Sequence, residues 1–258
     1  MNGERAGRFD VTGRTALVTG SSRGLGLVQA RGLAEAGARV VLNGRDPQTV
    51  EAARERLASD GLDVHAVPFD VARADQVQDG VRFVEERVGP IDILVNNAGI
   101  QYRAPLEDFP EEEWRRILDV NLTGAFLVSR AVVATMKDRG KGKIINICSL
   151  QSELGRSTIA PYAAAKGGLR MLTRAMTVDW ARYGIQANAI GPGYLVTEMT
   201  QPLKDDPEFD RWIRGRTPAG RWGDPRELIG ALLFFASPAS DFVNGQILYV
   251  DGGITAAI

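Results

Sequence analysis

Short apolar runs rich in Val, Ile and Leu alternate along the chain with longer stretches in which apolar positions recur every three or four residues. The runs predict buried strands, and the periodic stretches predict amphipathic helices. The strands expected from this pattern are 15–18, 39–42, 64–67, 91–95, 143–148, 185–190 and 246–250. The helices expected between them are 25–36, 47–58, 74–88, 111–137, 160–183 and 226–235.

This order of elements predicts the α/β fold class. A strand, a helix and a second strand form a parallel unit, so helices are expected to cover both faces of the sheet. We therefore expect a single domain over residues 1–258, with a Rossmann fold and a doubly wound, seven-stranded parallel sheet. No internal repeat or linker interrupts the pattern.

Segment 191–224 departs from the alternation. Four prolines lie among its charged residues, and the segment follows directly on an expected strand. Ligands of parallel sheets bind beyond the carboxyl ends of the strands, so a long insertion there predicts a substrate lid. The alternative is a surface excursion without a function.

Composition narrows the class of protein. The chain has 258 residues, of which 44% are hydrophobic and 24% charged, enough for one large core. A net charge of -1 provides no basic field, so we expect neither nucleic acid nor a membrane surface as a partner. The start of the chain lacks the apolar core of a signal peptide, and no window approaches eighteen uncharged apolar residues. We therefore expect a cytoplasmic protein.

The chain has one cysteine, Cys148, and one histidine, His65. These numbers exclude an internal disulfide and argue against a metal site. Cys148 adjoins Ser149, yet a small buried hydrophobe at a strand end is the favoured interpretation.

A glycine-rich turn, residues 19–26, follows the first expected strand and opens the first helix. Glycines permit a tight turn and a close approach of a pyrophosphate, whose charge is met by backbone amides and by the helix dipole. Because the turn stands at the start of a strand-helix-strand repeat, it predicts a dinucleotide site.

The end of the second strand distinguishes between two cofactors. An NAD site usually carries Asp or Glu about twenty residues after the turn, where it bonds the ribose hydroxyls. Here the strand ends Asn43-Gly44-Arg45, without a carboxylate, whereas Arg45 and Arg23 offer guanidinium groups to a 2′-phosphate. We expect NADP rather than NAD. The alternative is that both arginines are exposed and bind nothing.

Tyr162 and Lys166 form a candidate proton-transfer pair. Residues four apart on a helix lie one turn apart on the same face, so the Lys166 ammonium would favour the phenolate and lower the pKa of Tyr162. Ser149, at the end of a strand, offers a hydroxyl. A tyrosine with a lowered pKa beside a hydroxyl is suited to moving a proton to or from an oxygen.

The motifs at the ends of the expected strands resemble those of the short-chain dehydrogenase/reductase family, and the resemblance spans essentially the whole chain. The matching positions are the turn 19–26, Asp70, Val71, Asn96, Asn97, Ala98, Gly99, Asn121, Ser149, Tyr162, Lys166, Pro192, Gly193 and Thr197. The resemblance implies an NAD(P)-dependent oxidoreductase that interconverts a secondary hydroxyl and a ketone.

The resemblance also implies a catalytic set of Asn121, Ser149, Tyr162 and Lys166. Tyr162 would be the general acid in carbonyl reduction and the general base in alcohol oxidation. Ser149 would donate to the substrate oxygen, and Lys166 would also bond the nicotinamide ribose. Asn121 would hold a water molecule that links the lysine to solvent.

For the nucleotide, the resemblance places Asp70 and Val71 near the adenine, residues 97–99 along the ribose and phosphates, and Pro192 with Gly193 beside the nicotinamide. The expected cofactor-binding residues are Gly20, Ser22, Arg23, Gly24, Leu25, Gly26, Asn43, Arg45, Asp70, Val71, Asn97, Ala98, Gly99, Tyr162, Lys166, Pro192, Gly193 and Thr197. Asn96 has an alternative role, as a brace between strands.

Four segments outside the common motifs resemble family members that act on sugar acids. They are residues 41–45, 146–149, 152–156 and 216–223. The resemblance implies D-gluconate and 5-keto-D-gluconate as the substrate pair. Residues 101–103 depart from it, because a more basic pair is expected there.

Charged residues near the reacting hydroxyl fit a small-molecule sugar acid. Arg103 would pair with the carboxylate, while Glu153 and Arg156 would bond hydroxyls. Ser149 and Tyr162 would contact the reacting oxygen. Arg156 has an equally weighted alternative, as a solvated charge.

Two alternative functions remain open. The first is a related reductase, such as 2-deoxy-D-gluconate 3-dehydrogenase or 3-oxoacyl-carrier-protein reductase, although the mixed charges of residues 204–206 argue against an acyl carrier protein. The second is an NADP-sensing binding protein without catalysis. The intact set of Ser149, Tyr162 and Lys166 argues against it.

The helices 111–137 and 160–183 resemble those through which relatives assemble, and they imply a homotetramer. Four small residues lie on the second helix: Ala163, Ala164, Gly167 and Gly168. The alternative explanation is that they allow close packing inside one subunit. The direction of the reaction and any role of a divalent ion stay open.

Overall fold

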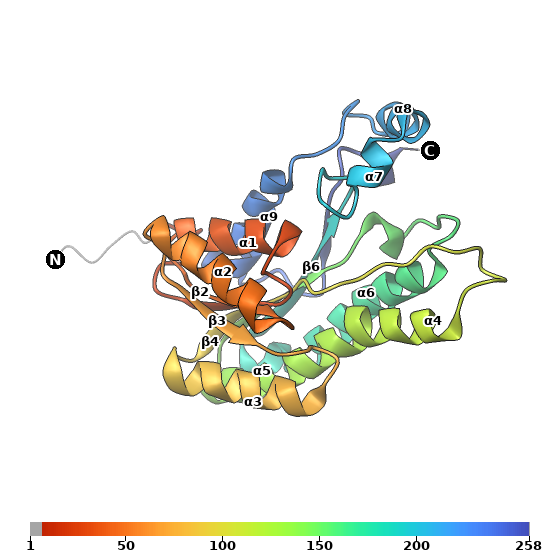
Figure 1. Ribbon diagram of the computed structural model, residues 1–258. Coiled ribbons are helices and arrows are strands. Elements are labelled where there is room, and N and C mark those ends of the chain that lie inside the picture. The colour runs from red at the N-terminus through yellow and green to blue at the C-terminus, as the bar shows by residue number, and fades with distance from the viewer. Residues whose placement is uncertain (1–6, 258) are drawn as a thin grey trace.

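A seven-stranded parallel sheet lies at the centre of the protein, in a computed structural model that describes residues 7–257 (Figure 1). The strands lie in the order β3-β2-β1-β4-β5-β6-β7, and each neighbouring pair is parallel. Their bounds are β1 Thr15–Val18, β2 Arg39–Gly44, β3 Val64–Pro68, β4 Ile91–Asn96, β5 Gly142–Ile147, β6 Ile185–Pro192 and β7 Ile247–Val250. The predicted fold class and all seven predicted strands are confirmed.

Helices cover both faces of the sheet (Figure 1). One layer contains α1 (Gly24–Glu35), α2 (Pro47–Ser59) and α9 (Ile229–Ala236), and the other contains α3 (Ala74–Arg87), α5 (Gly124–Arg139) and α6 (Ala160–Trp180). Successive residues of a strand point to opposite layers, so Val18 belongs to the first core and Leu17 to the second. The strands therefore read as continuous apolar runs.

The strand order opens a crevice between β1 and β4. From β1 the chain moves outward to β2 and β3, and it then returns to place β4 on the other side of β1. The connections after β1 and β4 consequently lead away in opposite directions, which is where open parallel sheets bind their ligands. The glycine-rich turn and residues 97–99 both leave the sheet at this crevice.

The predicted helix 111–137 is not continuous. The structure contains α4 (Glu111–Leu118), a π-helical turn over Asp119–Thr123 and then α5. The cause is tertiary, because the Asn121 side chain turns inward and bonds both backbone groups of Ile100. A π turn accommodates one extra residue in the helix and is common at functional sites.

The stretch Glu111–Arg139 is also apolar and long enough, by length and composition, to meet a criterion for crossing a membrane. Half of its most apolar window is buried inside the protein. Core helices of folded proteins meet the same criterion, and α5 packs against α3 and the sheet. We therefore interpret the stretch as a core helix.

Segment 193–224 rises from the end of β6 and carries α7 (Gln201–Lys204) and α8 (Pro207–Arg216), which stand apart from the two helical layers at the top of Figure 1. It has a small core of its own, formed by Leu203, Ile213 and Trp222 with Tyr194, Val196 and Phe209 packed against them. This core makes the segment a compact unit rather than a loose loop.

Candidate active site

The glycine-rich turn is tied to the end of β4 by side chains on both sides of the crevice. Thr19 Oγ1 accepts bonds from the amides of Asn97 and Ala98, each at 3.0 Å. The Asn97 side chain donates in return to the carbonyls of Thr19 and Gly20, at 2.9 and 3.1 Å. Asn97 and Ala98 therefore lie beside the turn and fix its shape.

Two glycines of this turn have no room for a side chain. Gly20 has φ +63°, and a Cβ there would lie 2.8 Å from the Cα of Ala98. A Cβ on Gly26 would overlap the Gly20 carbonyl and the Asn97 amide. The backbone is thus packed as closely as a phosphate-binding turn requires.

The N-terminus of α1 is equipped to receive an anion. Arg23 occupies the N-cap position without a side-chain hydrogen bond, and the first turn contains no acidic residue. The amides and the positive end of the helix dipole are therefore available to a pyrophosphate. Arg23 and Arg45 are exposed, and neither forms an ion pair with any residue in 7–257. These features fit a nucleotide with an additional phosphate.

Asn43 does not face this site. Its side chain is fully buried, where Nδ2 donates to the carbonyls of Val67 and Phe69 and Oδ1 accepts the amide of Gly20. It braces the ends of β2 and β3 under the turn. Its side chain therefore has a structural role beneath the turn, and its predicted part in cofactor binding stays a prediction.

The other predicted nucleotide residues lie at strand ends along the same edge of the sheet. Asp70 follows β3 and accepts the amide of Ala72, while Val71 is buried against Gly124. At the far side, Gly193 leaves β6 so close to β7 that a Cβ would lie 2.6 Å from the Cα of Asp251. Thr197 shares a hydrogen bond of 3.0 Å with Thr200.

Ser149 stands at the end of β5 and caps a short 3-10 turn. Its Oγ donates to Oε1 of Gln151 at 2.5 Å and accepts the Gln151 amide at 3.3 Å. A hydroxyl has one proton to donate, so a substrate oxygen competes with Gln151 for it. Gln151 was not among the predicted site residues, although its position two residues after Ser149 in a capping turn places it within reach.

Tyr162 and Lys166 lie on the first turns of α6, with the Lys166 Nζ 5.7 Å from the centroid of the tyrosine ring. Lys166 is buried, its ammonium donates to the carbonyl of Ile147 at 2.6 Å, and burial lowers its pKa to about 8. Burial raises the pKa of Tyr162 to about 12, although the Ser149 hydroxyl acts in the opposite direction. The predicted lowering of the tyrosine pKa is therefore wrong for the free protein.

Asn121 is buried at the π turn, where Oδ1 accepts the amide of Ile100 at 2.8 Å and Nδ2 donates to its carbonyl at 2.9 Å. The side chain amide is thus engaged by the protein. It fixes the loop after β4 against α5, which places Gly99 next to Asn121.

The three predicted substrate residues differ in their surroundings. Glu153 is paired with Arg170 of α6 at 2.7 Å, so its carboxylate is already engaged. Arg156 bonds the hydroxyl of Tyr194 at 3.4 Å, and its guanidinium lies 4.6 Å from the centroid of the Phe209 ring. Arg103 is exposed as a whole residue, but its guanidinium is partly buried. This partial burial, and after it the positive charge of Arg156, lowers the pKa of Arg103.

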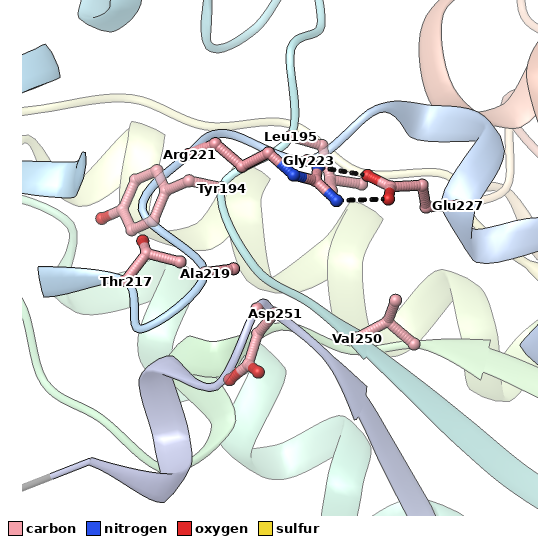
Figure 2. Close-up of a pocket in the computed structure, with 10 residues that line it drawn as sticks. Tyr194, Leu195, Thr217, Ala219, Arg221, Gly223, Glu227, Val250 and Asp251 are labelled. Carbon is pink, nitrogen blue, oxygen red and sulfur yellow. Dashed lines mark hydrogen bonds and ion pairs between the residues drawn. The ribbon is translucent and has the colours of Figure 1, made fainter.

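A small pocket of about 100 Å³ lies at the root of segment 193–224, between the ends of β6 and β7 (Figure 2). Tyr194, Thr217 and Asp251 lie around it, and Arg221 pairs with both oxygens of Glu227 at 2.8 and 2.7 Å. None of Ser149, Tyr162 and Lys166 lines this pocket. It belongs to the attachment of the segment rather than to the proton-transfer residues.

Comparison with known proteins gives consistent matches. A family model described as enoyl-(acyl carrier protein) reductase matches residues 20–255. Gluconate 5-dehydrogenase of Gluconobacter oxydans is 52% identical over 97% of this chain and 98% of its own length. A 2-dehydro-3-deoxy-D-gluconate 5-dehydrogenase of Formosa agariphila is 50% identical over 97% and 96%. A crystal structure of gluconate 5-dehydrogenase from Burkholderia cenocepacia with NADP and tartrate has a TM-score of 0.95 and 56% identity, covering 97% of this chain and 98% of that one.

Proposed function

The chain belongs to the short-chain dehydrogenase/reductase family, and from this premise we propose that it interconverts D-gluconate and 5-keto-D-gluconate with NADP(H). One observation carries the reaction class. Ser149, Tyr162 and Lys166 lie at the same edge of the sheet as the glycine-rich turn. The substrate is supported by the similarity to gluconate 5-dehydrogenases over nearly the whole chain.

NADP supplies or accepts a hydride when bound, and the chain offers residues that fit it. The closely packed Gly20 and Gly26 and the uncapped start of α1 suit the pyrophosphate, and Arg23 with Arg45 suits the 2′-phosphate. Arg45→Asp is expected to remove the preference for NADPH over NADH, whereas Arg56→Asp at the other end of α2 leaves it unchanged. An unaltered preference in Arg45→Asp would refute this assignment.

Tyr162 is proposed as the acid and base. With a pKa of about 12 its phenol is protonated at neutral pH and is set to donate to a carbonyl oxygen during reduction. Oxidation requires the phenolate, which positive charge stabilises. Lys166, with a pKa of about 8, carries that charge at pH 7.

Ser149 and Asn121 complete the proposed set. Ser149 orients the reacting oxygen by donating a hydrogen bond to it. To do so, the Ser149 hydroxyl gives up the hydrogen bond that it donates to Gln151. Asn121 opens the helix at the π turn, where we propose that a water molecule carries protons between Lys166 and solvent. Tyr162→Phe is expected to reduce turnover by roughly 10²–10⁴-fold while NADPH still binds.

Segment 191–224 is proposed as the substrate lid of a single domain. Its separate core lets it move as a unit, and Arg156 connects it to the loop after Ser149 through Tyr194 and Phe209. Hydrogen exchange in this segment is expected to slow when both NADPH and D-gluconate are present. Unchanged exchange would contradict the lid.

A substrate panel tests the proposed reaction directly. NADPH consumption is expected with 5-keto-D-gluconate, and the Arg103→Ala variant is expected to raise its KM because Arg103 is proposed to bind the carboxylate. The relative that is 50% identical makes 2-dehydro-3-deoxy-D-gluconate a second candidate for the sugar acid that is oxidised. Assays of NADP-dependent oxidation of D-gluconate and of 2-dehydro-3-deoxy-D-gluconate distinguish the two candidates. NADPH binding without turnover of any carbonyl would favour the sensor instead.

We propose a homotetramer as the assembled form. Phe126 on α5 is 42% exposed, and Met171 and Val178 on α6 are 59% and 82% exposed, so the long helices present apolar side chains to solvent. Sedimentation of the wild type is expected to give four chains, and Val178→Glu is expected to reduce the assembly. A monomeric wild type would refute the proposal.

We also propose a cytoplasmic location. The single cysteine, Cys148, is buried and free, which suits a reducing compartment. Cell fractionation tests this location, and recovery in a periplasmic or secreted fraction would contradict it.

A further inference from the structure

Several arginines around segment 193–224 are paired with carboxylates of the described residues, whereas Arg103 and Arg156 are not. Arg170 is paired with Glu153, Arg214 with Asp210 and Arg221 with Glu227. Within residues 7–257, neither Arg103 nor Arg156 forms an ion pair, and the positive charge of Arg156 contributes to the lowered pKa of Arg103. Two like charges are thus placed near each other without a negative partner.

A backbone hydrogen bond joins the two loops that carry these arginines. The amide of Ala104 donates to the carbonyl of Thr158 at 3.1 Å, which connects the residue after Arg103 to a residue two positions after Arg156. Thr158 has φ +69° and is the non-glycine residue with a positive φ among those described. This conformation is strained for a β-branched residue, and such strain is concentrated at binding sites.

The Arg156 guanidinium is also oriented by segment 193–224. It lies 4.6 Å from the centroid of Phe209 and 3.4 Å from the hydroxyl of Tyr194. An arginine held against an aromatic ring keeps N–H groups in its plane for a carboxylate. Phe209 and Tyr194 belong to the core of the segment, so the guanidinium links that core to the loop after Ser149.

We propose that Arg103 and Arg156 form a two-arginine clamp for the substrate carboxylate, and that Arg156 is a specificity-determining residue which couples carboxylate binding to the lid. This inference rests on the proposed function and refines it, because Arg156 was predicted to bond substrate hydroxyls. The carboxylate offsets the repulsion between the two guanidinium groups and fastens the loop of Arg156 to Tyr194 and Phe209. A neutral sugar or polyol supplies no such charge.

The test measures binding of D-gluconate and of neutral D-glucitol to the NADPH complex by calorimetry, so that no turnover intervenes. The wild type is expected to prefer D-gluconate. Arg156→Gln is expected to weaken D-gluconate roughly 10–100-fold, because a hydrogen bond to a charged group contributes about 1.5–3 kcal/mol. Arg156→Lys is expected to recover part of this affinity, and Arg211→Gln, on an exposed residue of α8, is the matched control.

The clamp is overturned if Arg156→Gln binds D-gluconate within twofold of the wild type, or if the wild type does not discriminate D-gluconate from D-glucitol. A merely structural role of Arg156 would also weaken NADPH binding and lower the thermal midpoint, both of which are expected to stay unchanged. Binding of D-gluconate should also lose part of its salt dependence in Arg156→Gln.

Turnover assays separate this inference from the proposed function. If the wild type binds D-gluconate through Arg156 but does not reduce 5-keto-D-gluconate, the proposed reaction fails and the clamp stands. If the wild type reduces 5-keto-D-gluconate and Arg156→Gln does so with an unchanged KM, the clamp fails and the reaction stands.

Discussion

Replacing Lys166 by Met is expected to stabilise the free protein while removing its activity. The lysine side chain is 4% exposed, and burial lowers its pKa from the usual 10.5 to about 8. At about 1.4 kcal/mol per pH unit, this lowering corresponds to a destabilisation of roughly 3 kcal/mol at pH 7. The lost hydrogen bond from the charged Lys166 ammonium to the Ile147 carbonyl offsets about 2 kcal/mol. Lys166→Met should therefore raise the free energy of unfolding by about 1 kcal/mol.

The pH dependence of this gain follows from the direction of the shift. Below pH 8 Lys166 is charged in both the folded and the unfolded chain, so the wild type bears the full cost of burying the charge. Between pH 8 and about 10.5 the folded protein has released the proton while the unfolded chain retains it, so the wild type becomes more stable as the pH rises. The advantage of Lys166→Met should fall by about 2 kcal/mol between pH 7 and pH 9.5, so that the variant becomes the less stable protein at pH 9.5.

Urea unfolding at pH 7 and pH 9.5 measures both values, and NADPH oxidation with 5-keto-D-gluconate measures the loss of turnover, expected at roughly 10²–10⁴-fold. The matched control is Lys141→Met, because that lysine side chain is 71% exposed and should show no pH-dependent difference. A variant that is less stable than the wild type at pH 7, or whose advantage does not change with pH, would refute the reasoning.

Two further predictions concern the backbone around the site. Gly26→Ala should lower NADPH affinity at least tenfold and destabilise the fold by about 2 kcal/mol, because a Cβ would overlap backbone atoms. Gly230→Ala, in open space on α9, should instead stabilise the fold by up to about 1 kcal/mol. Calorimetry and urea unfolding distinguish the two variants, and equal behaviour would count against the close packing of the turn. Thr158→Gly should relieve the positive φ, stabilise the protein by about 1 kcal/mol and raise the KM for the keto acid by loosening the loop of Arg156. A lower thermal midpoint in Thr158→Gly would contradict that reading.

The sequence predicted the sheet well because its central strands are buried on both faces. Runs such as 15–18 and 91–95 consist mostly of apolar residues, and glycine-rich or polar segments delimit them. The glycine-rich turn was equally readable, since its residues have to meet a local backbone requirement. Both features depend on neighbouring residues in the chain.

The features that the sequence did not reveal depend on partners in distant parts of the chain. The π turn at Asn121 depends on Ile100, and Asn43 donates to the carbonyls of Val67 and Phe69. The pairing of Glu153 with Arg170 was equally invisible in the sequence. The pKa of Tyr162 was expected to be lowered by its lysine neighbour, but burial raises it, and burial is not visible in a spacing of four residues.

The small core of segment 193–224 gives the protein a modular active site. Leu203, Ile213 and Trp222 pack with one another, while the glycine-rich turn rests on the strands and helices of the main cores. Substitutions in the core of the segment, beyond Gly193 and Thr197 at its root, therefore leave the nucleotide half of the site supported. A change of substrate can evolve in this part of the chain without a new way to bind the cofactor.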